Sequence, residues 1–514
     1  MTGGLGKLSR SLLAGAGAIG MLAIGNPEAK ATDVQQLEQT LLAVQEQVKQ
    51  LQREVASAKA AAASAQSAAA KAGSGGGGGD DLDLKVKWKG APELSSKDGK
   101  FSFKTRGRLH VDYNGIDQDE SITGEGDISA VEIRRARLGV EGVLFYDWKY
   151  KVEFEFAGSG VAFKDAYLAY ANWINSIDFS EIRVGNQYVY TSLEQVTSSN
   201  YLTFMERAAF TEAFLPSVEA DRQIGAALLL GDKHWSVQTG YYGASTGAAN
   251  NVAGQEDFDD DKTAFSARGT VAPINREVNG VHQVVHLGAA YRLRHAGELR
   301  ACGAVYCLDD DGEVDGSALF QYRARGADLH LADRFVDTPQ FSDGDDMWNL
   351  QGALVYGPFS VQGEYTQLEA YGVRSFEGDL VNTVNPTYDG WYVDASLFLT
   401  GETRAYDGSQ GIWGRTKVKN PFYVRSGGWG AWQLAGRYDV LDLSDSAAAM
   451  RASYGGAEYG VQETWLIGLN WLPTDYVAIK LNVTQSEIKG AAGDFNRNRG
   501  AEITGVGVRT QIDW

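Results

Sequence analysis

The feature that most constrains this chain is an alternation of apolar and polar residues, which recurs from residue 101 to the C-terminus. Because successive side chains of a β-strand point to opposite faces, this period of two predicts strands with one apolar and one hydrated face. In the first strand the apolar face carries Phe101, Phe103, Leu109, Val111 and Tyr113, and the polar face carries Lys104, Arg106, Arg108, His110 and Asp112. The 62 glycines and 9 prolines among 514 residues fit a fold of many strands and turns.

Counting such segments predicts about sixteen strands, and therefore an all-β fold. The expected strands are 101–113, 131–144, 147–157, 161–171, 177–187, 223–231, 234–243, 263–273, 282–294, 346–356, 359–370, 389–399, 429–441, 463–473, 476–487 and 501–514. Connections on one side are mostly tight, as at Gly357-Pro358, whereas most on the other side are long and acidic, as at 295–345. A soluble β-sandwich also alternates, but the even strand number, the unequal connections and the final Trp514 are typical of a bacterial outer-membrane barrel. We expect an antiparallel transmembrane β-barrel with a water-filled lumen.

The first 100 residues have a different organisation. Residues 1–31 have the features of an export signal, with a short basic start, a small apolar stretch and the cleavage motif Ala29-Lys30-Ala31. Over 32–72, apolar residues recur in steps of three and four, which predicts an α-helical coiled coil that self-associates. The alternative is a helix packed on its own domain. A glycine run opens a flexible linker and lead-in at 73–100, and the barrel occupies 101–514.

The alternation also assigns basic side chains to the lumen. The expected channel-lining residues are Lys104, Arg106, Arg108, His110, Arg135, Arg137, Lys149, Lys151, Arg183, Arg437 and Arg509. Arginine is a permanent cation whose planar fork suits carboxylate and phosphate, so a row of arginines predicts a path for small anions. The alternative is that these cations pair with Asp112, Glu141, Glu153 and Glu155 and leave a lumen of mixed charge.

Two connections depart from the general pattern. Residues 400–428 form a long connection on the short-turn side. Residues 188–222 are long and only moderately polar, and we expect this segment to fold inward and constrict the pore rather than form an ordinary external loop. The expected constriction residues are Glu194, Glu206, Arg207, Glu212 and Arg222.

Several blocks of the chain resemble the phosphate-selective porin O and P family of outer-membrane channels. These blocks are Glu132 to Gly142, Lys164 to Leu168, Leu193 to Arg207, Trp391 to Val393 and Leu399 to Glu402. The resemblance covers most of 101–514 and implies a homotrimeric sixteen-stranded porin whose third loop enters the channel and whose basic lining passes anions such as phosphate. Within the matching motifs, the resemblance assigns the role of basic lining to Arg135, Arg137 and Arg207. Selective members carry lysines at the constriction, whereas 188–222 contains no lysine.

A trimer would place three copies of the 32–72 helix side by side in the periplasm, where a coiled coil could reinforce assembly or reach the cell wall. The alternative function is therefore a general or cation-preferring porin whose stalk mainly tethers the outer membrane to peptidoglycan. Partners in either case are outer-membrane lipid, small hydrophilic solutes and two further copies of the chain.

Other classes of function find little support. A net charge of −19 argues against a nucleic-acid partner. The six histidines lack metal-site spacing, and no glycine-rich phosphate loop follows a strand and opens a helix, so we expect no enzyme, metal or cofactor. Cys302 and Cys307 could form a disulfide in an oxidising compartment or remain buried thiols.

Overall fold

The computed structural model describes residues 49, 84–158, 160–215, 221–243, 263–295, 319–373, 385–425, 427–445, 459–490 and 498–514. The chain divides into two compact units, Met1–Asp81 and Leu82–Trp514. In the first unit only the helical Lys49 is described, so the expected signal peptide and coiled coil lie outside the described residues, as do Cys302 and Cys307. Among the described helices, none is both long and apolar enough to cross a membrane.

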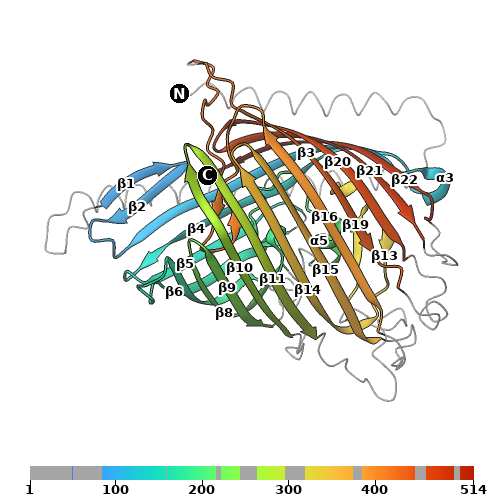
Figure 1. Ribbon diagram of the computed structural model, residues 1–514, viewed down its shortest axis with the longest axis horizontal. Coiled ribbons are helices and arrows are strands. Elements are labelled where there is room, and N and C mark those ends of the chain that lie inside the picture. Colours follow the sequence, from blue (N-terminus) through green and yellow to red (C-terminus); the bar gives the residue numbers. More distant parts are fainter. Residues whose placement is uncertain are drawn as a thin grey trace. The chain divides into compact units, whose positions relative to one another are not determined.

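Sixteen antiparallel strands of the second unit form a closed wall (Figure 1). They are β3 (Ser102–Asp117), β4 (Ile128–Leu144), β5 (Trp148–Glu155), β6 (Ala162–Ala171), β7 (Phe179–Tyr188), β8 (Arg222–Asp232), β9 (Trp235–Tyr242), β10 (Thr263–Val278), β11 (Val281–His295), β14 (Ser342–Tyr356), β15 (Phe359–Val373), β16 (Thr387–Phe398), β19 (Ala431–Asp442), β20 (Val461–Thr474), β21 (Val477–Lys489) and β22 (Glu502–Asp513). Each strand pairs with the next along the chain, and β22 closes the ring on β3, where Arg509 lies opposite Asp112. The predicted sixteen-stranded barrel is confirmed.

The alternation in the sequence gives the wall its two faces. In β20, Trp465 and Ile467 point outward and are each 63% exposed, whereas their neighbours Thr464 and Leu466 point inward and are buried. An apolar exterior with a polar interior is the arrangement that a lipid bilayer requires of a barrel.

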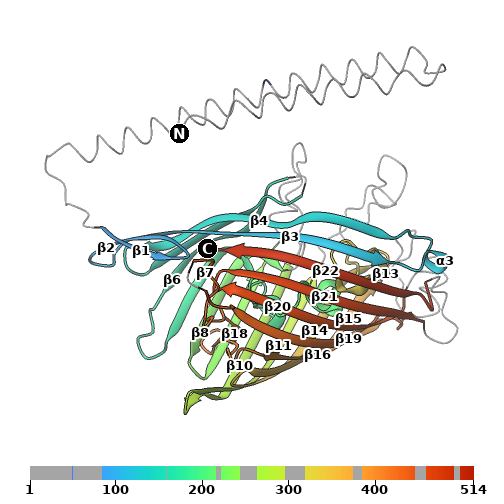
Figure 2. The same ribbon diagram turned by 90° about the horizontal axis from the view of Figure 1, so that it is seen from above.

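Described segments of three connections fold into the barrel (Figures 1 and 2). The connection from β7 to β8 carries α4 (Leu193–Val196) and α5 (Ala209–Phe214). The connection from β11 to β14 carries β12 (Arg323–Arg325), the 3₁₀ turn η3 (Gly326–Asp328) and β13 (Arg334–Asp337). From the short-turn side, the connection from β16 to β19 inserts β17 (Tyr406–Asp407) and β18 (Ile412–Trp413), so that Trp413 is buried beside Leu193. We call the first two the β7–β8 insert and the β11–β14 insert.

An apolar core lies between these inserts and the wall. Phe210 of α5 stacks on Tyr392 of β16, with ring centroids 6.0 Å apart, and Phe335 of β13 belongs to the same buried cluster. Part of the lumen is therefore packed with side chains, in contrast to the open, water-filled lumen that strand number alone predicts. Residues 295–345 were expected to form one of the long connections outside the barrel, and this expectation was wrong for residues 319–341.

Two glycines on the inward face of β22 make room for the inserts. A Cβ atom on Gly505 would lie 2.5 Å from Leu329 of the β11–β14 insert. A Cβ atom on Gly507 would lie 2.9 Å from the sulfur of Met205 in the β7–β8 insert. A side chain at either position would require Leu329 or Met205 to move, so the two glycines let these side chains of the inserts lie close to the wall.

The chain enters the wall through a hairpin that the sequence analysis had included in the lead-in. It consists of β1 (Leu84–Lys89) and β2 (Ala91–Ser96), and β2 pairs with the first residues of β3.

Candidate functional site

The structure pairs most of the expected lining cations with lumen carboxylates. The ion pairs are Arg106 with Glu141 at 2.6 Å, Arg108 and Arg137 with Glu153 at 3.4 and 3.1 Å, Arg137 with Glu155 at 2.6 Å, Lys149 with Glu181 at 2.9 Å, Arg183 with Glu181, and Lys151 with Asp165. Lys104 has no ion-pair partner among the described residues, and Nε2 of His110 donates a hydrogen bond to the side-chain oxygen of Asn200 at 3.2 Å. Much of the positive charge on the wall is therefore balanced by neighbouring strands.

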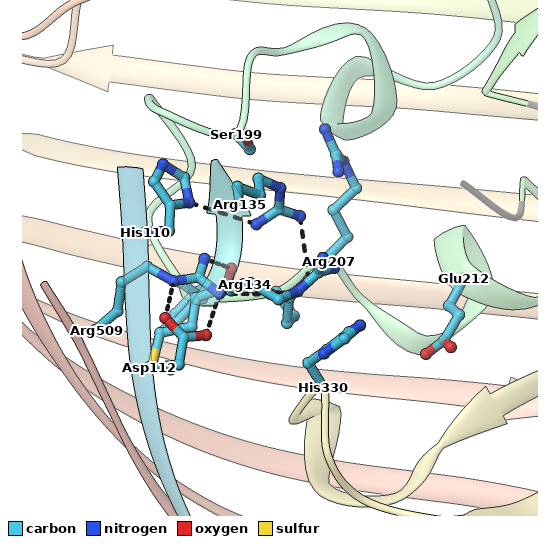
Figure 3. Close-up of polar contacts among 12 residues, drawn as sticks. His110, Asp112, Arg134, Arg135, Ser199, Arg207, Glu212, His330 and Arg509 are labelled. Atoms are coloured by element: carbon cyan, nitrogen blue, oxygen red, sulfur yellow. Dashed lines mark hydrogen bonds and ion pairs between the residues drawn. The ribbon is translucent and has the colours of Figure 1, made fainter. Parts of the chain in front are cut away.

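The β7–β8 insert supplies further carboxylates to the wall arginines. Glu206 lies 2.9 Å from Arg134, 3.5 Å from Arg135 and 2.6 Å from Arg509, while Arg509 also bonds Asp112 at 2.6 Å (Figure 3). Burial raises the pKa of Glu206, but the three guanidinium groups outweigh burial and hold this pKa well below its usual value. Glu206 is thus a permanent anion that fastens the insert to β4 and β22.

A second anchor lies on the opposite side of the insert. Glu194 accepts hydrogen bonds from Arg437 of β19 and from the backbone N–H of Ala208, the latter at 2.9 Å. Both side chains of the Arg437–Glu194 pair are almost completely buried. Arg222, at the end of the insert, pairs with Asp165 at 2.7 Å and with Asp221 at 2.8 Å. Three of the five expected constriction residues, Glu194, Glu206 and Arg222, therefore hold the insert in place.

Arg134 enters the site because the strand register shifts. His110 lies opposite Arg135, but Val111 lies opposite Ile133, so Arg134 is an extra residue in β4. Such a bulge reverses which residues face inward. A strict alternation would put Arg134 outside, whereas its guanidinium group donates two hydrogen bonds to Glu206. The sequence analysis missed this residue for that reason.

Arg207 differs from the wall arginines. Its guanidinium group donates to three main-chain carbonyls, those of Glu194 at 3.0 Å, Gln195 at 3.2 Å and Thr197 at 3.0 Å. No carboxylate among the described residues forms an ion pair with it. Neutral carbonyls fix the position of Arg207 without cancelling its charge.

The β11–β14 insert brings a second group of cations that sequence reasoning did not select. Arg325 and Arg334 share one carboxylate, Glu212 of α5. Arg323 is exposed and has no ion-pair partner among the described residues. His330 lies 2.8 Å from Glu132 of β4. The length of the 295–345 connection was one sign that it could reach the lumen.

Two adjoining cavities, of about 320 and 240 Å³, lie between the inserts and the wall, and Arg134, Arg135, Arg207, Asp221 and His330 line both. Among the described residues, the two cavities are lined by nine cationic side chains, Arg134, Arg135, Arg137, Lys164, Arg207, Arg222, Arg323, Arg325 and Arg334, and by six acidic ones, Glu132, Glu155, Glu206, Glu212, Asp221 and Asp328. Burial and the neighbouring Asp439 raise the pKa of Asp328 well above its usual value. The described lining of the cavities thus carries a surplus of positive charge.

The described residues contain no group of three or more His, Cys, Asp or Glu side chains placed to hold a metal ion. Guanidinium groups line the two cavities, and their planar forks suit carboxylate and phosphate.

Comparisons with known proteins cover the same part of the chain. The model of a family described as phosphate-selective porin O and P matches residues 103–514. An uncharacterized protein of Caulobacter vibrioides is 28% identical over 434 residues, covering 84% of this chain and 77% of that protein. Porin O of Pseudomonas aeruginosa is 27% identical over 449 residues, covering 84% of this chain and 92% of that protein. Among solved structures, the anion-selective porin from Comamonas acidovorans aligns with a TM-score of 0.46 at 13% identity, covering 80% of this chain and 100% of that chain.

Proposed function

The chain belongs to the phosphate-selective porin O and P family and is an outer-membrane porin, and we propose that it passes small hydrophilic anions in preference to cations. Transport is passive, since a fixed charged passage needs no energy source. The preferred solutes are compact anions such as phosphate or small carboxylates, which match the planar fork of arginine.

The observation that carries this proposal is the state of Arg207. Its three carbonyl partners leave a full positive charge at the wall that the two cavities share. An anion passing from one cavity to the other comes close to this charge, which attracts anions and repels cations.

The charges around Arg207 also favour anions over cations. Arg134, Arg135 and Arg509 share Glu206, with Asp112 as a further partner of Arg509, and Arg325 and Arg334 share Glu212. Each group has more cations than carboxylates. A passage with a fixed excess of one charge concentrates ions of the other sign and excludes ions of its own.

A homotrimer is part of the proposal. The resemblance to a trimeric family and the heptad spacing at 32–72 both support it, and the coiled coil would hold three chains together on the periplasmic side.

The test is the zero-current potential of the purified protein in a planar bilayer under a KCl gradient, repeated with added phosphate. We expect a chloride-selective potential that Arg207→Gln moves toward zero. The matched control is Lys417→Gln, since Lys417 pairs with Asp475 and its side chain is 73% exposed at the short-turn end. A cation-selective potential in the unaltered protein would overturn the proposal in favour of a general porin. Absence of any channel activity in the unaltered protein would favour the alternative function, in which the coiled-coil stalk tethers the outer membrane to peptidoglycan.

A further inference from the structure

The hairpin β1–β2 has two chemically different faces. Leu84, Val86 and Trp88 are 52%, 67% and 73% exposed on one face of β1. Lys85, Lys87 and Lys89 alternate with them and point to the other face, where they are also exposed. Among the described large apolar side chains, only that of Val424 is more exposed than Trp88. An exposed apolar row of this kind at the edge of a barrel indicates a site that contacts lipid or another protein.

The strand register connects the apolar row to the outer face of the wall. Val86 lies opposite Leu94, and Leu94 lies opposite Phe103, which belongs to the outward row of β3. Directly opposite residues in an antiparallel pair share a face. The apolar side of the hairpin is therefore a continuation of the surface that the porin presents to lipid.

The position of the hairpin is fixed by the end of β22. The pairing of β22 with β3 stops at Arg108, and β2 takes the free edge of β3 at Ser102, Phe103 and Lys104 (Figure 2). At the tip, Gly90 packs on the ring of Tyr476, since a Cβ atom there would lie only 2.4 Å from the ring. The hairpin thus prolongs the wall beyond its last strand at the short-turn end, which faces the periplasm in outer-membrane barrels.

The charge of this region is opposite to that of the whole protein. Lys85, Lys87, Lys89, Lys97 and Lys100 stand against Glu93 and Asp98 between residues 84 and 100, in a chain of net charge −19. Aromatic residues surround the same rim, where Phe101 and Phe145 make an edge contact at 5.4 Å and Lys100 lies above both rings. Aromatic rings combined with lysines are typical of the zone where acyl chains meet phosphate headgroups.

We propose that the β1–β2 hairpin is an anchor that inserts Leu84, Val86 and Trp88 into the periplasmic leaflet and extends its lysines to the phosphate groups of anionic phospholipids. The proposal rests on the outer-membrane location of the porin but not on its ion preference. Each lysine near an anionic surface adds to the binding, and the effect weakens in salt.

The test is photo-crosslinking of the full chain in vesicles of phosphatidylcholine with or without phosphatidylglycerol. A benzophenone amino acid is placed at Val86 and, as the matched control, at Lys87, the adjacent residue on the opposite face of the same strand. We expect adducts on acyl chains at position 86 at least fivefold above those at position 87, whose place at the phosphate groups keeps it out of the hydrocarbon, measured by tandem mass spectrometry. Chain-to-chain products at position 86 would overturn the proposal, since the hairpin would then cover a second copy, and equal labelling at both positions would overturn it as well.

A second variant tests the lysines. In Lys85→Gln/Lys87→Gln/Lys89→Gln, we expect adducts at position 86 in phosphatidylglycerol vesicles to fall to the level seen in phosphatidylcholine alone. Unchanged adducts would overturn the headgroup contacts. Because the hairpin lies outside the cavities, the zero-current potential should stay unchanged, so a failure of this proposal is distinguishable from a failure of the proposed ion preference.

Discussion

Two groups of arginines face the same lumen and behave differently. Arg437 and Arg509 are completely buried against carboxylates that the β7–β8 insert contributes, namely Glu194 and Glu206. Arg207 and Arg323 have no carboxylate partner among the described residues and line the cavities. The first group fastens the insert to the wall, and the second sets the electric field of the passage.

The difference shows that the number of basic residues does not measure the selectivity of a pore. A buried charge is costly unless it is paired, so a cation that packing encloses requires a carboxylate beside it. The acidic residues of the β7–β8 insert, which would seem to weaken an anion path, are largely used in this way. The charge left on the cavity lining comes from side chains that are not fully paired, and among the described residues this net charge is positive.

Removing an anchor should produce the largest effect. Glu206→Ala leaves Arg134 and Arg135 without their carboxylate, which should destabilise the insert by about 3–5 kcal/mol. We expect a marked fall in the temperature at which the detergent-solubilised barrel loses its folded migration on a gel. Lys417→Gln, which breaks an exposed pair, should stay within about 1 kcal/mol of the unaltered protein. Equal unfolding temperatures for the two variants would show that Glu206 is no anchor.

Lowering the pH should weaken the same anchor, because Glu206 loses its negative charge when it is protonated. Because the pKa of Glu206 lies below its value in the unfolded chain, about 4.5, the stability it contributes is present above pH 4.5 and is lost as the pH falls through the lowered pKa. We expect the unfolding temperature of the unaltered protein to drop more steeply below pH 4.5 than that of Glu206→Gln. Parallel curves for the two proteins would contradict the paired state of Glu206.

Arg207→Gln should show the opposite pattern, with a small effect on stability and a larger effect on ion selectivity. Its carbonyl partners are neutral, so stability should change by no more than about 1 kcal/mol. A unit charge about 4 Å away in a water-like medium favours a monovalent anion by about 1 kcal/mol and disfavours a cation by the same amount, which is roughly thirtyfold in the ratio of anion to cation permeability. The zero-current potential under a KCl gradient measures this ratio. A variant that unfolds early but keeps its selectivity would place Arg207 in the anchoring group.

The sequence predicted the wall well because the wall depends on a local rule. Alternation follows from strand geometry at every residue, so all sixteen strands could be located within a few residues of their ends. The same rule failed at Arg134, where one extra residue in β4 reverses the faces, and no feature of Glu132-Ile133-Arg134-Arg135 marks the bulge.

The inserts were harder to predict, because their positions depend on contacts between distant parts of the chain. The length of 188–222 correctly indicated an inward loop, but the β11–β14 insert, with Arg323, Arg325, Arg334 and His330, was assigned to the exterior. A signal was available in β22, where Gly505 and Gly507 occupy inward positions and leave space for Leu329 and Met205. The sequence indicated Asp112, Glu141, Glu153 and Glu155 as partners of wall arginines, and all four form ion pairs with them. It did not indicate the pairs made by the β7–β8 insert, since Glu206 and Arg509 are far apart in the chain.

The smallest expected effect tests the β11–β14 insert alone. Arg323 is exposed, so water and salt screen its charge more strongly than that of Arg207, and Arg323→Gln should lower the permeability ratio only about twofold. The difference should shrink further when both salt concentrations of the gradient are raised tenfold, since the Debye length falls to about 3 Å at 1 M. An effect of Arg323→Gln as large as that of Arg207→Gln, and equally resistant to salt, would mean that the narrowest point of the passage lies at the β11–β14 insert and that the β7–β8 insert is mainly its support.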